Sequence, residues 1–164
     1  MPLLHNGDRF PRLSIRKVGG GTIALPDDLD GSFGVVLIYR GAWCPYCNAQ
    51  LAAFARSSAK LDEAGVKVVA FSVDDEATTA ALAAKHNVRF PLGYGADADA
   101  VAAAVGAYVN SEPHYLQTTG FVLAPDGTLV NAVYSSAAIG RLVPDDVAGL
   151  VAYIKSKTSQ ASAA

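Results

Sequence analysis

The features typical of nucleic-acid-binding, membrane and secreted proteins are scarce or absent in this 164-residue sequence. Lys and Arg number 13 against 15 Asp and Glu, and the basic residues form no stripe that could follow a nucleic-acid backbone. No hydrophobic run reaches membrane-spanning length, and the first residues lack the basic start and apolar stretch of a secretory signal. We therefore expect no nucleic-acid or membrane partner, and a cytoplasmic location.

Cysteine is the scarcest informative residue, with only Cys44 and Cys47 in the chain. A pair this close encloses too short a loop to staple a fold, and in a reducing compartment such a pair is more often catalytic or metal-binding than structural. No second cysteine pair is present, and His5, His86 and His114 have no ligand spacing among themselves. We expect a redox-active dithiol without metal or cofactor; two inert buried cysteines are the plainer alternative.

The order of hydrophobic segments in the first part of the chain predicts alternating strands and helices after an N-terminal arm, residues 1–32, with at most short strands. A buried strand precedes the cysteines, a helix opens at Pro45 and stops at Gly65, and this order predicts parallel pairing with right-handed crossovers. The expected strands are 35–39 and 66–73, a short extended piece is 90–92, and the expected helices are 45–64, 76–86 and a short one from Asp97 toward Gly106.

The later part of the chain has a different character. Residues 120–123 and 129–134 flank a turn sequence and predict an antiparallel hairpin, and Pro144 opens an amphipathic final helix. Residues 156–164 are expected to fray. A βαβ half followed by a ββα half is the thioredoxin arrangement, so we predict one α/β domain, residues 1–164, with a central mixed sheet flanked by helices.

The dithiol lies where this arrangement makes a thiol reactive. If the helix begins at Pro45, Cys44 is its N-cap, where free backbone N–H groups and the positive dipole end favour a thiolate. Cys47 lies about one turn on, close enough to resolve a mixed disulfide. We therefore expect Cys44 to be the nucleophile, Cys47 the resolving thiol, and Arg40 a stabiliser of the thiolate or the oxidant, although a solvated strand-end charge is the alternative for Arg40.

Structural roles are expected for the histidines, for two aspartates and for the tryptophan. The three histidines are expected at the surface. Asp74 and Asp75, at the end of the second buried strand, are expected to cap a helix and not to carry protons. Trp43 is expected to be a packing lid beside the dithiol more than a substrate contact.

The stretch from Tyr39 to Leu51, YRGAWCPYCNAQL, resembles the peroxiredoxin-like branch of the alkyl hydroperoxide reductase and thiol-specific antioxidant (AhpC/TSA) superfamily. Weaker echoes occur at residues 71–74, 90–92 and 121–127, and the resemblance covers roughly residues 5–155. The resemblance implies a thioredoxin-like fold, thiol redox chemistry on hydroperoxides, and a thiol as reductant.

Peroxiredoxins carry a Pro and a Thr or Ser at fixed distances before their peroxide-reacting cysteine, and two registers are open here. With Cys47 matched to that cysteine, Arg40 replaces the Pro and Cys44 replaces the Thr. With Cys44 matched instead, those places hold Leu37 and Gly41.

The resemblance also suggests where a substrate would bind. Gln50 stands where an acid is common, and Thr118 stands where the family brings a later arginine, so we expect no later arginine at this site. Thr118 and Thr119, with Trp43 and Tyr46, are the substrate-binding candidates.

The resulting hypothesis is a thiol-dependent antioxidant oxidoreductase that reduces hydroperoxides or disulfides and forms a Cys44–Cys47 disulfide. A thioredoxin-like protein or a low-molecular-weight thiol would reduce that disulfide. The alternatives are a thioredoxin- or glutaredoxin-type disulfide reductase without peroxidase activity, and a non-catalytic redox-sensing module. A monomer and a homodimer are both compatible with the sequence.

Overall fold

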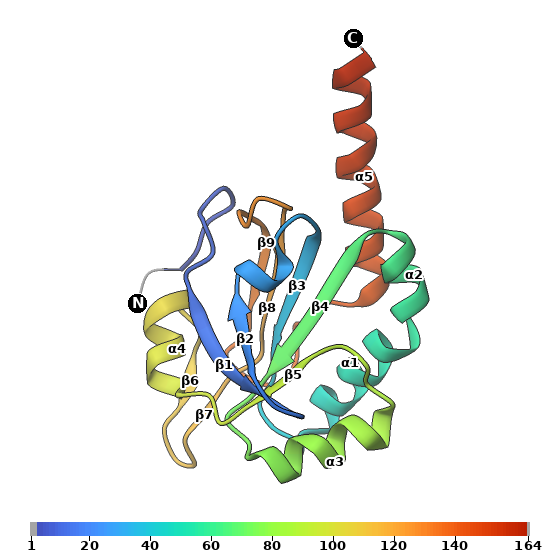
Figure 1. Cartoon of the computed structure of the whole chain (residues 1–164). Coiled ribbons are helices and arrows are strands. Elements are labelled where there is room, and N and C mark those ends of the chain that lie inside the picture. Colours follow the sequence, from blue (N-terminus) through green and yellow to red (C-terminus); the bar gives the residue numbers. More distant parts are fainter. Residues whose placement is uncertain (1–2, 164) are drawn as a thin grey trace.

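The computed structural model describes residues 3–163, with side chains described through Ser159. One mixed sheet has the strand order β2-β1-β5-β4-β3-β8-β9 and is flanked by helices on both faces (Figure 1). The predicted α/β architecture with a central mixed sheet is thus confirmed. The strands are β1 Leu13–Lys17, β2 Thr22–Leu25, β3 Phe33–Ile38, β4 Val66–Phe71, β5 Leu92–Tyr94, β8 Thr119–Leu123 and β9 Leu129–Tyr134.

The middle of the sheet is its most buried part. All six residues of β3 are buried, as expected for a continuous apolar run covered on both faces. β3 pairs in parallel with β4 and antiparallel with β8, and the β8–β9 pair forms the predicted hairpin. The sheet therefore holds the carboxyl end of β3, where the cysteines follow, in a rigid position.

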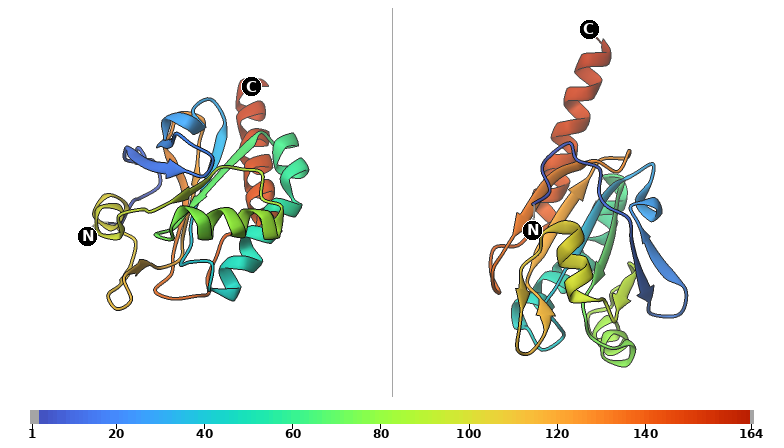
Figure 2. Two further views of the ribbon diagram at one scale, coloured as in Figure 1. Left: turned by 60° about the horizontal axis from the view of Figure 1, so that its bottom comes forward. Right: turned by 90° about the vertical axis from the view of Figure 1, so that its left-hand side faces the viewer.

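Side chains of alternate strand residues form two separate apolar clusters. On one face, Val35 and Leu37 pack with α1 Pro45–Arg56, α2 Ser58–Glu63, α3 Glu76–His86 and α5 Pro144–Ala163. On the other face, Val36 and Ile38 pack with α4 Ala98–Val105 and with the β1–β2 hairpin. The views in Figure 2 show α4 on the face opposite α1 and α5.

The N-terminal region is built into the sheet. Its two short strands form a hairpin, and β1 pairs antiparallel with the short strand β5. A 3-10 turn, η1 Asp27–Leu29, then leads into β3. The two short strands of the arm therefore extend the sheet at one edge.

Two helices differ from the expected boundaries. The helix expected to run from Pro45 to Gly65 is broken at Ser57, within a pair of serines, which compete for backbone hydrogen bonds and are indifferent helix formers. α5 continues as a helix beyond Ser156 and projects from the body (Figure 1), and fraying of this end stays a prediction.

The chain between α4 and β8 holds a small element that the sequence pattern did not predict. β6 Val109–Asn110 and β7 Tyr115–Leu116 form a separate two-stranded ribbon.

Within residues 3–163, no helix is long and apolar enough to cross a membrane.

Candidate active site at the dithiol

Cys44 occupies the N-cap of α1, as predicted from Pro45. Its backbone is extended, with φ −88° and ψ 116°, and its Sγ accepts a hydrogen bond from the Cys47 N–H at 3.2 Å. Both cysteines are free thiols, with exposed fractions of only 0% for Cys44 and 1% for Cys47. The helix start therefore directs a backbone donor at the Cys44 sulfur, the arrangement that stabilises a thiolate.

Arg40 reaches both sulfurs from the end of β3. Its backbone N–H donates to Cys47 Sγ at 3.3 Å, and its Nη1 lies 3.9 Å from Cys44 Sγ. Its Nε donates to Gln117 Oε1 at 3.0 Å and its Nη2 to the Tyr115 hydroxyl at 3.0 Å. The unpredicted β6–β7 ribbon thus helps to orient this guanidinium over the dithiol.

Trp43 covers Arg40. The guanidinium carbon lies 4.8 Å from the Trp43 ring centroid and 5.4 Å from that of Tyr115, and the two rings meet edge to face at 5.0 Å. Trp43 is nevertheless 55% exposed to solvent. Trp43 therefore packs as a lid with one face in solvent.

A second arginine lies at the site, so the expectation that no later arginine would be present is wrong. Arg141 Nη2 lies 3.0 Å from Cys47 Sγ and 3.6 Å from Cys44 Sγ, and donates to Thr118 Oγ1 at 2.8 Å. The prediction failed because it looked for the arginine near Thr118, whereas the loop between β9 and α5 supplies it. One signal was available: Arg141 is the only charged residue between Gly127 and Pro144.

The remaining candidates, Thr118, Thr119 and Tyr46, differ in whether they are linked to the dithiol. Thr118 holds Arg141, whereas the buried Thr119 hydroxyl donates to the Gln117 carbonyl at 3.1 Å and supports the neighbouring strand. Tyr46 is 55% exposed and lines a small apolar pocket beside Arg141. Thr118 is therefore the member of this pair that is linked to the dithiol.

Asn48 and His86 fix the loop before the helix. Asn48 Nδ2 donates to the carbonyls of Ala42 and Cys44, both at 2.8 Å, and its Oδ1 lies 2.6 Å from His86 Nε2. Because the Asn48 amide nitrogen is the donor, its oxygen accepts and His86 must carry its proton on Nε2. His86 was expected simply at the surface, but it is half-buried and clamps the residue that holds the Cys44 backbone.

The two neighbouring aspartates have different partners. Asp75 caps α3, as predicted, and its carboxylate accepts from the Thr78 N–H at 2.8 Å, a hydrogen bond that lowers the pKa of Asp75. Asp74 does not cap the helix: its Oδ2 accepts from the Ala42 N–H at 2.7 Å. Asp74 therefore ties the end of β4 to the loop that carries Cys44.

The two thiols differ in acidity. Burial raises the pKa of the Cys44 thiol, but hydrogen bonds from Cys47, the positive charge of Arg141 and a hydrogen bond from Arg40 outweigh burial, so the pKa is lowered overall. Burial is also the largest influence on Cys47, and with the hydrogen bond to Cys44 it raises the pKa of that thiol. The arrangement favours a Cys44 thiolate that accepts a hydrogen bond from a Cys47 thiol.

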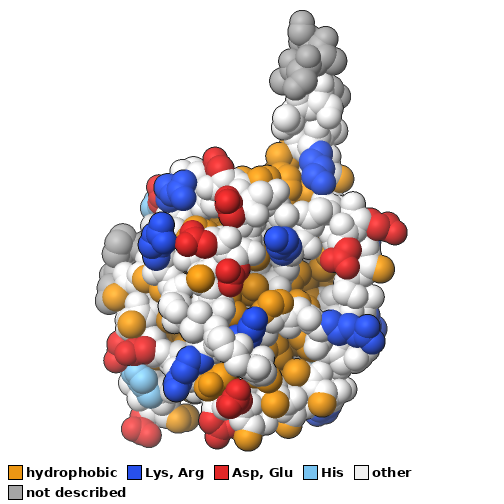
Figure 3. Space-filling model, viewed as in Figure 1, with side chains coloured by type: hydrophobic (Ala, Val, Ile, Leu, Met, Phe, Trp, Pro, Cys, Tyr) orange, Lys and Arg blue, Asp and Glu red, His pale blue; other side chains and the backbone are white. Residues whose placement is uncertain are grey.

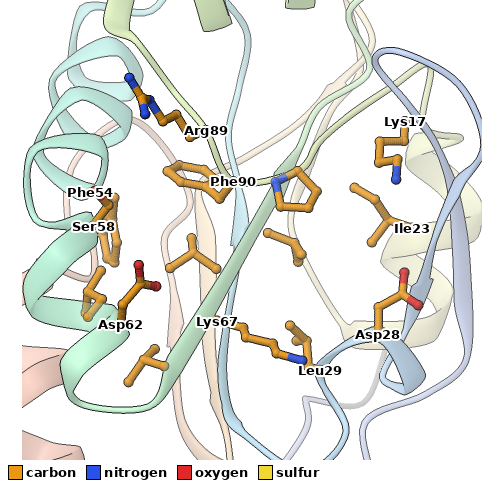
Figure 4. A pocket seen from close by; sticks show the side chains of 15 residues that line it. Lys17, Ile23, Asp28, Leu29, Phe54, Ser58, Asp62, Lys67, Arg89 and Phe90 are labelled. Carbon is orange, nitrogen blue, oxygen red and sulfur yellow. The ribbon is translucent and has the colours of Figure 1, made fainter.

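A separate hollow lies at the opposite end of β4, where β5 is too short to pair with Val66–Val69 (Figure 4). It has a volume of about 280 Å³, with Ile23, Leu29 and Phe54 among its apolar lining residues. Figure 3 shows apolar atoms gathered on this face of the molecule between charged side chains. None of the residues predicted for the site lines this hollow.

Within residues 3–163, no group of three or more His, Cys, Asp or Glu side chains could hold a metal ion.

Comparison with protein families decides the assignment of this thiol site, because the model of the AhpC/TSA family matches residues 6–132. The chain belongs to the AhpC/TSA family. It is thus a thiol-dependent oxidoreductase of the peroxiredoxin type, as the resemblance implied. A peroxiredoxin of Methanothermobacter thermautotrophicus is 25% identical over 151 residues, covering 90% of this chain and 71% of that protein. A peroxiredoxin of Treponema denticola is 27% identical over 145 residues, covering 86% and 68%.

Solved structures of AhpC/TSA-type proteins share the fold. Mycobacterium bovis AhpC superimposes with a TM-score of 0.80 at 20% identity, covering 96% of each chain. The peroxidoxin BcpB of Mycobacterium tuberculosis gives a TM-score of 0.79 at 20% identity, covering 92% of this chain and 98% of the other. The predicted thioredoxin-like fold is therefore confirmed.

Proposed function

We propose that this protein reduces hydroperoxides, with Cys44 as the attacking thiolate and Cys47 as the resolving thiol. The observation that carries the proposal is the convergence of two guanidinium groups and a helix start on one pair of sulfurs. Positive groups fixed at a reacting centre stabilise the negative charge that develops in the transition state. The family supplies the substrate class, a hydroperoxide, and a thiol as the reductant.

The proposed reaction transfers two electrons from the dithiol to the O–O bond of the hydroperoxide. The Cys44 thiolate attacks the terminal oxygen of the hydroperoxide, the O–O bond breaks, and the alkoxide leaves as an alcohol after taking a proton. Cys44 becomes a sulfenic acid. The Cys47 sulfur then attacks the Cys44 sulfur, a water molecule leaves with the sulfenic oxygen, and a disulfide forms. A thioredoxin-like dithiol or two low-molecular-weight thiols return two electrons and restore both thiols.

The two arginines have separate roles in this proposal. Arg141 contacts both sulfurs and Thr118, so it can hold the Cys44 thiolate and follow the charge as it moves to the peroxide oxygen. Arg40 Nη1 lies 3.9 Å from Cys44 Sγ and can donate to the leaving oxygen. Gln50 Oε1 accepts from Arg141 Nη1 at 2.7 Å and keeps that guanidinium aimed at the sulfurs.

The burial of the sulfurs favours a small oxidant. A hydroperoxide group has two oxygen atoms and needs a narrow approach, whereas a protein disulfide must bring a wide surface to the thiolate. Cys44 and Cys47 are almost fully buried, and Trp43 packs over Arg40 beside them. Disulfide reduction is the second candidate, and the feature that favours it is the Cys-Pro-Tyr-Cys pair itself with the exposed rings of Trp43 and Tyr46 beside it.

Rapid mixing of the reduced protein with hydrogen peroxide and with cumene hydroperoxide tests the proposal. We expect both thiols to be lost much faster than those of free cysteine. A rate no greater than that of free cysteine would overturn the peroxidase proposal. Rapid reduction of insulin disulfides or of a glutathione mixed disulfide by the same sample would then favour the second candidate.

Two single variants test the order of the cysteines. Cys47→Ser should still react once with peroxide and accumulate a sulfenic acid on Cys44, which dimedone labels and mass spectrometry locates. Cys44→Ser should leave the Cys47 thiol slow to react. The reverse pattern would assign the first attack to Cys47. Loss of partner capture in Cys44→Ser, with no change in peroxide or disulfide turnover, would favour the redox-sensing alternative.

A further inference from the structure

The charges at the dithiol do not balance. Arg40 and Arg141 both lie at the sulfurs, yet neither takes part in the ion pairs found among the described side chains, which are Arg12–Asp27, Lys60–Asp145 and His114–Asp99. The residue that holds Arg141 is Gln50, a neutral amide. The Asp74 carboxylate, at the loop that carries Cys44, accepts from the Ala42 N–H.

The imbalance grows when the dithiol is oxidised. A guanidinium stays protonated at every physiological pH, so both arginines keep their charge throughout the cycle. In the reduced state a Cys44 thiolate offsets one of the two positive charges. In the disulfide state neither sulfur carries a charge, and two half-buried cations face the pair without a counter-charge. The oxidised site therefore attracts an anion more strongly than the reduced site does.

Arg40 is the cation with donors to spare. Arg141 uses all three of its nitrogens within the protein, on the Ala138 carbonyl, Gln50 and Thr118. Arg40 uses Nε and Nη2, while its Nη1 has only the 3.9 Å contact with Cys44 Sγ, and that contact weakens when the sulfur loses its charge. Its stacking on Trp43 keeps the planar fork in place. The N–H groups of Nη1, with the second N–H of Nη2, are left to donate to a carboxylate.

We propose that the reductant of the oxidised enzyme is a low-molecular-weight thiol that carries a carboxylate, which Arg40 holds beside the Cys44–Cys47 disulfide. This inference rests on the proposed function, because it requires that disulfide to form. The thiolate of the reductant attacks one sulfur, the Cys44–Cys47 bond breaks, and a mixed disulfide and one protein thiolate result. A second molecule of the reductant attacks the mixed disulfide, releasing the oxidised reductant and the second protein thiol.

Three small thiols of different charge test the proposal: 3-mercaptopropionate is an anion, 2-mercaptoethanol is neutral and cysteamine is a cation. The protein disulfide is prepared with diamide, and the rate of its reduction by each thiol is measured in stopped flow, per thiolate. Each rate is divided by that of the same thiol with hydroxyethyl disulfide, which removes differences in intrinsic reactivity. We expect a normalised rate at least several-fold higher for the anion than for the neutral thiol, the cation slowest, and the differences to shrink as salt is added.

Arg40→Gln should strongly reduce the differences among the three normalised rates, with only the smaller preference due to the charge of Arg141 left. Arg16→Gln should leave the differences as in the wild type. Arg16 is a matched control because it also stacks on an aromatic ring, that of Tyr94 at 5.1 Å, away from the dithiol. Equal normalised rates in the wild type, or an anion preference that Arg40→Gln leaves at its wild-type size, would overturn the inference.

The outcome is separable from that of the proposed function. Because diamide makes the disulfide, the two proposals can fail separately. A protein that does not react with peroxide but prefers the anionic thiol would contradict the peroxidase proposal and support the carboxylate-bearing reductant. A protein that reacts quickly with peroxide but shows no charge preference would support the peroxidase proposal and overturn the inference about the reductant.

Discussion

The two ends of the central strands are built on different principles. At the carboxyl end of β3, the sulfurs, two arginines and their partners are joined by a network of hydrogen bonds in which Arg141 alone contacts four other side chains. At the amino end of β4, a hollow is lined by apolar side chains of both clusters, such as Ile23 and Phe54. Hydrogen bonds orient the reacting groups at the dithiol, whereas apolar contacts stabilise the end with the hollow. Substitutions at the dithiol should therefore change the reactivity of the thiols, and substitutions at the hollow should change the free energy of unfolding.

The largest effect is expected from Cys44→Ser. It removes the nucleophile, so peroxide turnover should fall to the background of the buffer. Folding should hardly change, because serine is a preferred N-cap residue and can accept the Cys47 N–H. Turnover assays and urea unfolding measure the two effects. A free energy of unfolding lowered by more than about 2 kcal/mol would contradict this separation, since it exceeds the usual value of a cap.

Arg141→Gln should have the next largest effect. Loss of a charged donor to a developing negative charge costs about 10²–10³ in rate. Because the positive charge of Arg141 is one of the influences that lower the pKa of Cys44, its removal should also raise that pKa. The rate of thiol loss falls as pH drops below the Cys44 pKa, so the pH–rate curve should move to higher pH. An unmoved curve in stopped-flow measurements across pH would show that Arg141 does not act on the thiolate.

Asn48→Ala should have an intermediate effect on the site. It frees the carbonyls of Ala42 and Cys44, and lost hydrogen bonds of this kind cost about 1–3 kcal/mol in all. The thiolate absorbance of Cys44, followed against pH, should report a less well-ordered helix start. His86→Gln is the matched control: it keeps an N–H donor for Asn48 and should change the titration less. Equal shifts in both variants would contradict the clamp.

Ile23→Val at the hollow should have the smallest effect. It removes one buried methylene and should lower the free energy of unfolding by about 0.5–1.5 kcal/mol. The Cys44 titration and the peroxide rate should stay as in the wild type, because Ile23 packs in the cluster on the other face of the sheet. A change in either would mean that the two ends are coupled, and would break the comparison.

Local patterns predicted those parts of the molecule that depend on neighbouring residues. The apolar run of β3, the proline at the start of α1 and the turn before β9 each act within a few residues of chain, so their positions could be predicted. The break at Ser57 was missed because the helix-forming pattern continues on both sides of it.

The site was only half predictable for the same reason. Cys44, Cys47 and Arg40 lie within one stretch of chain, and their proximity followed from the strand–helix junction. Arg141 is 97 residues from Cys44 and lies in a loop without periodicity, so only the three-dimensional path of the chain brings it to the sulfurs. The same holds for His86, which meets Asn48 because α3 packs beside α1.

Trp43 is the only tryptophan of the chain, and it adjoins Cys44 in sequence while its ring rests on Arg40. Indole fluorescence depends on nearby charges and on contact with solvent, and the tryptophan emission of this protein comes from one residue beside the reacting dithiol. Oxidation removes the charge of the thiolate, and binding of an anion at Arg40 returns one. Each half of the cycle should therefore leave its own optical signature in the unlabelled protein.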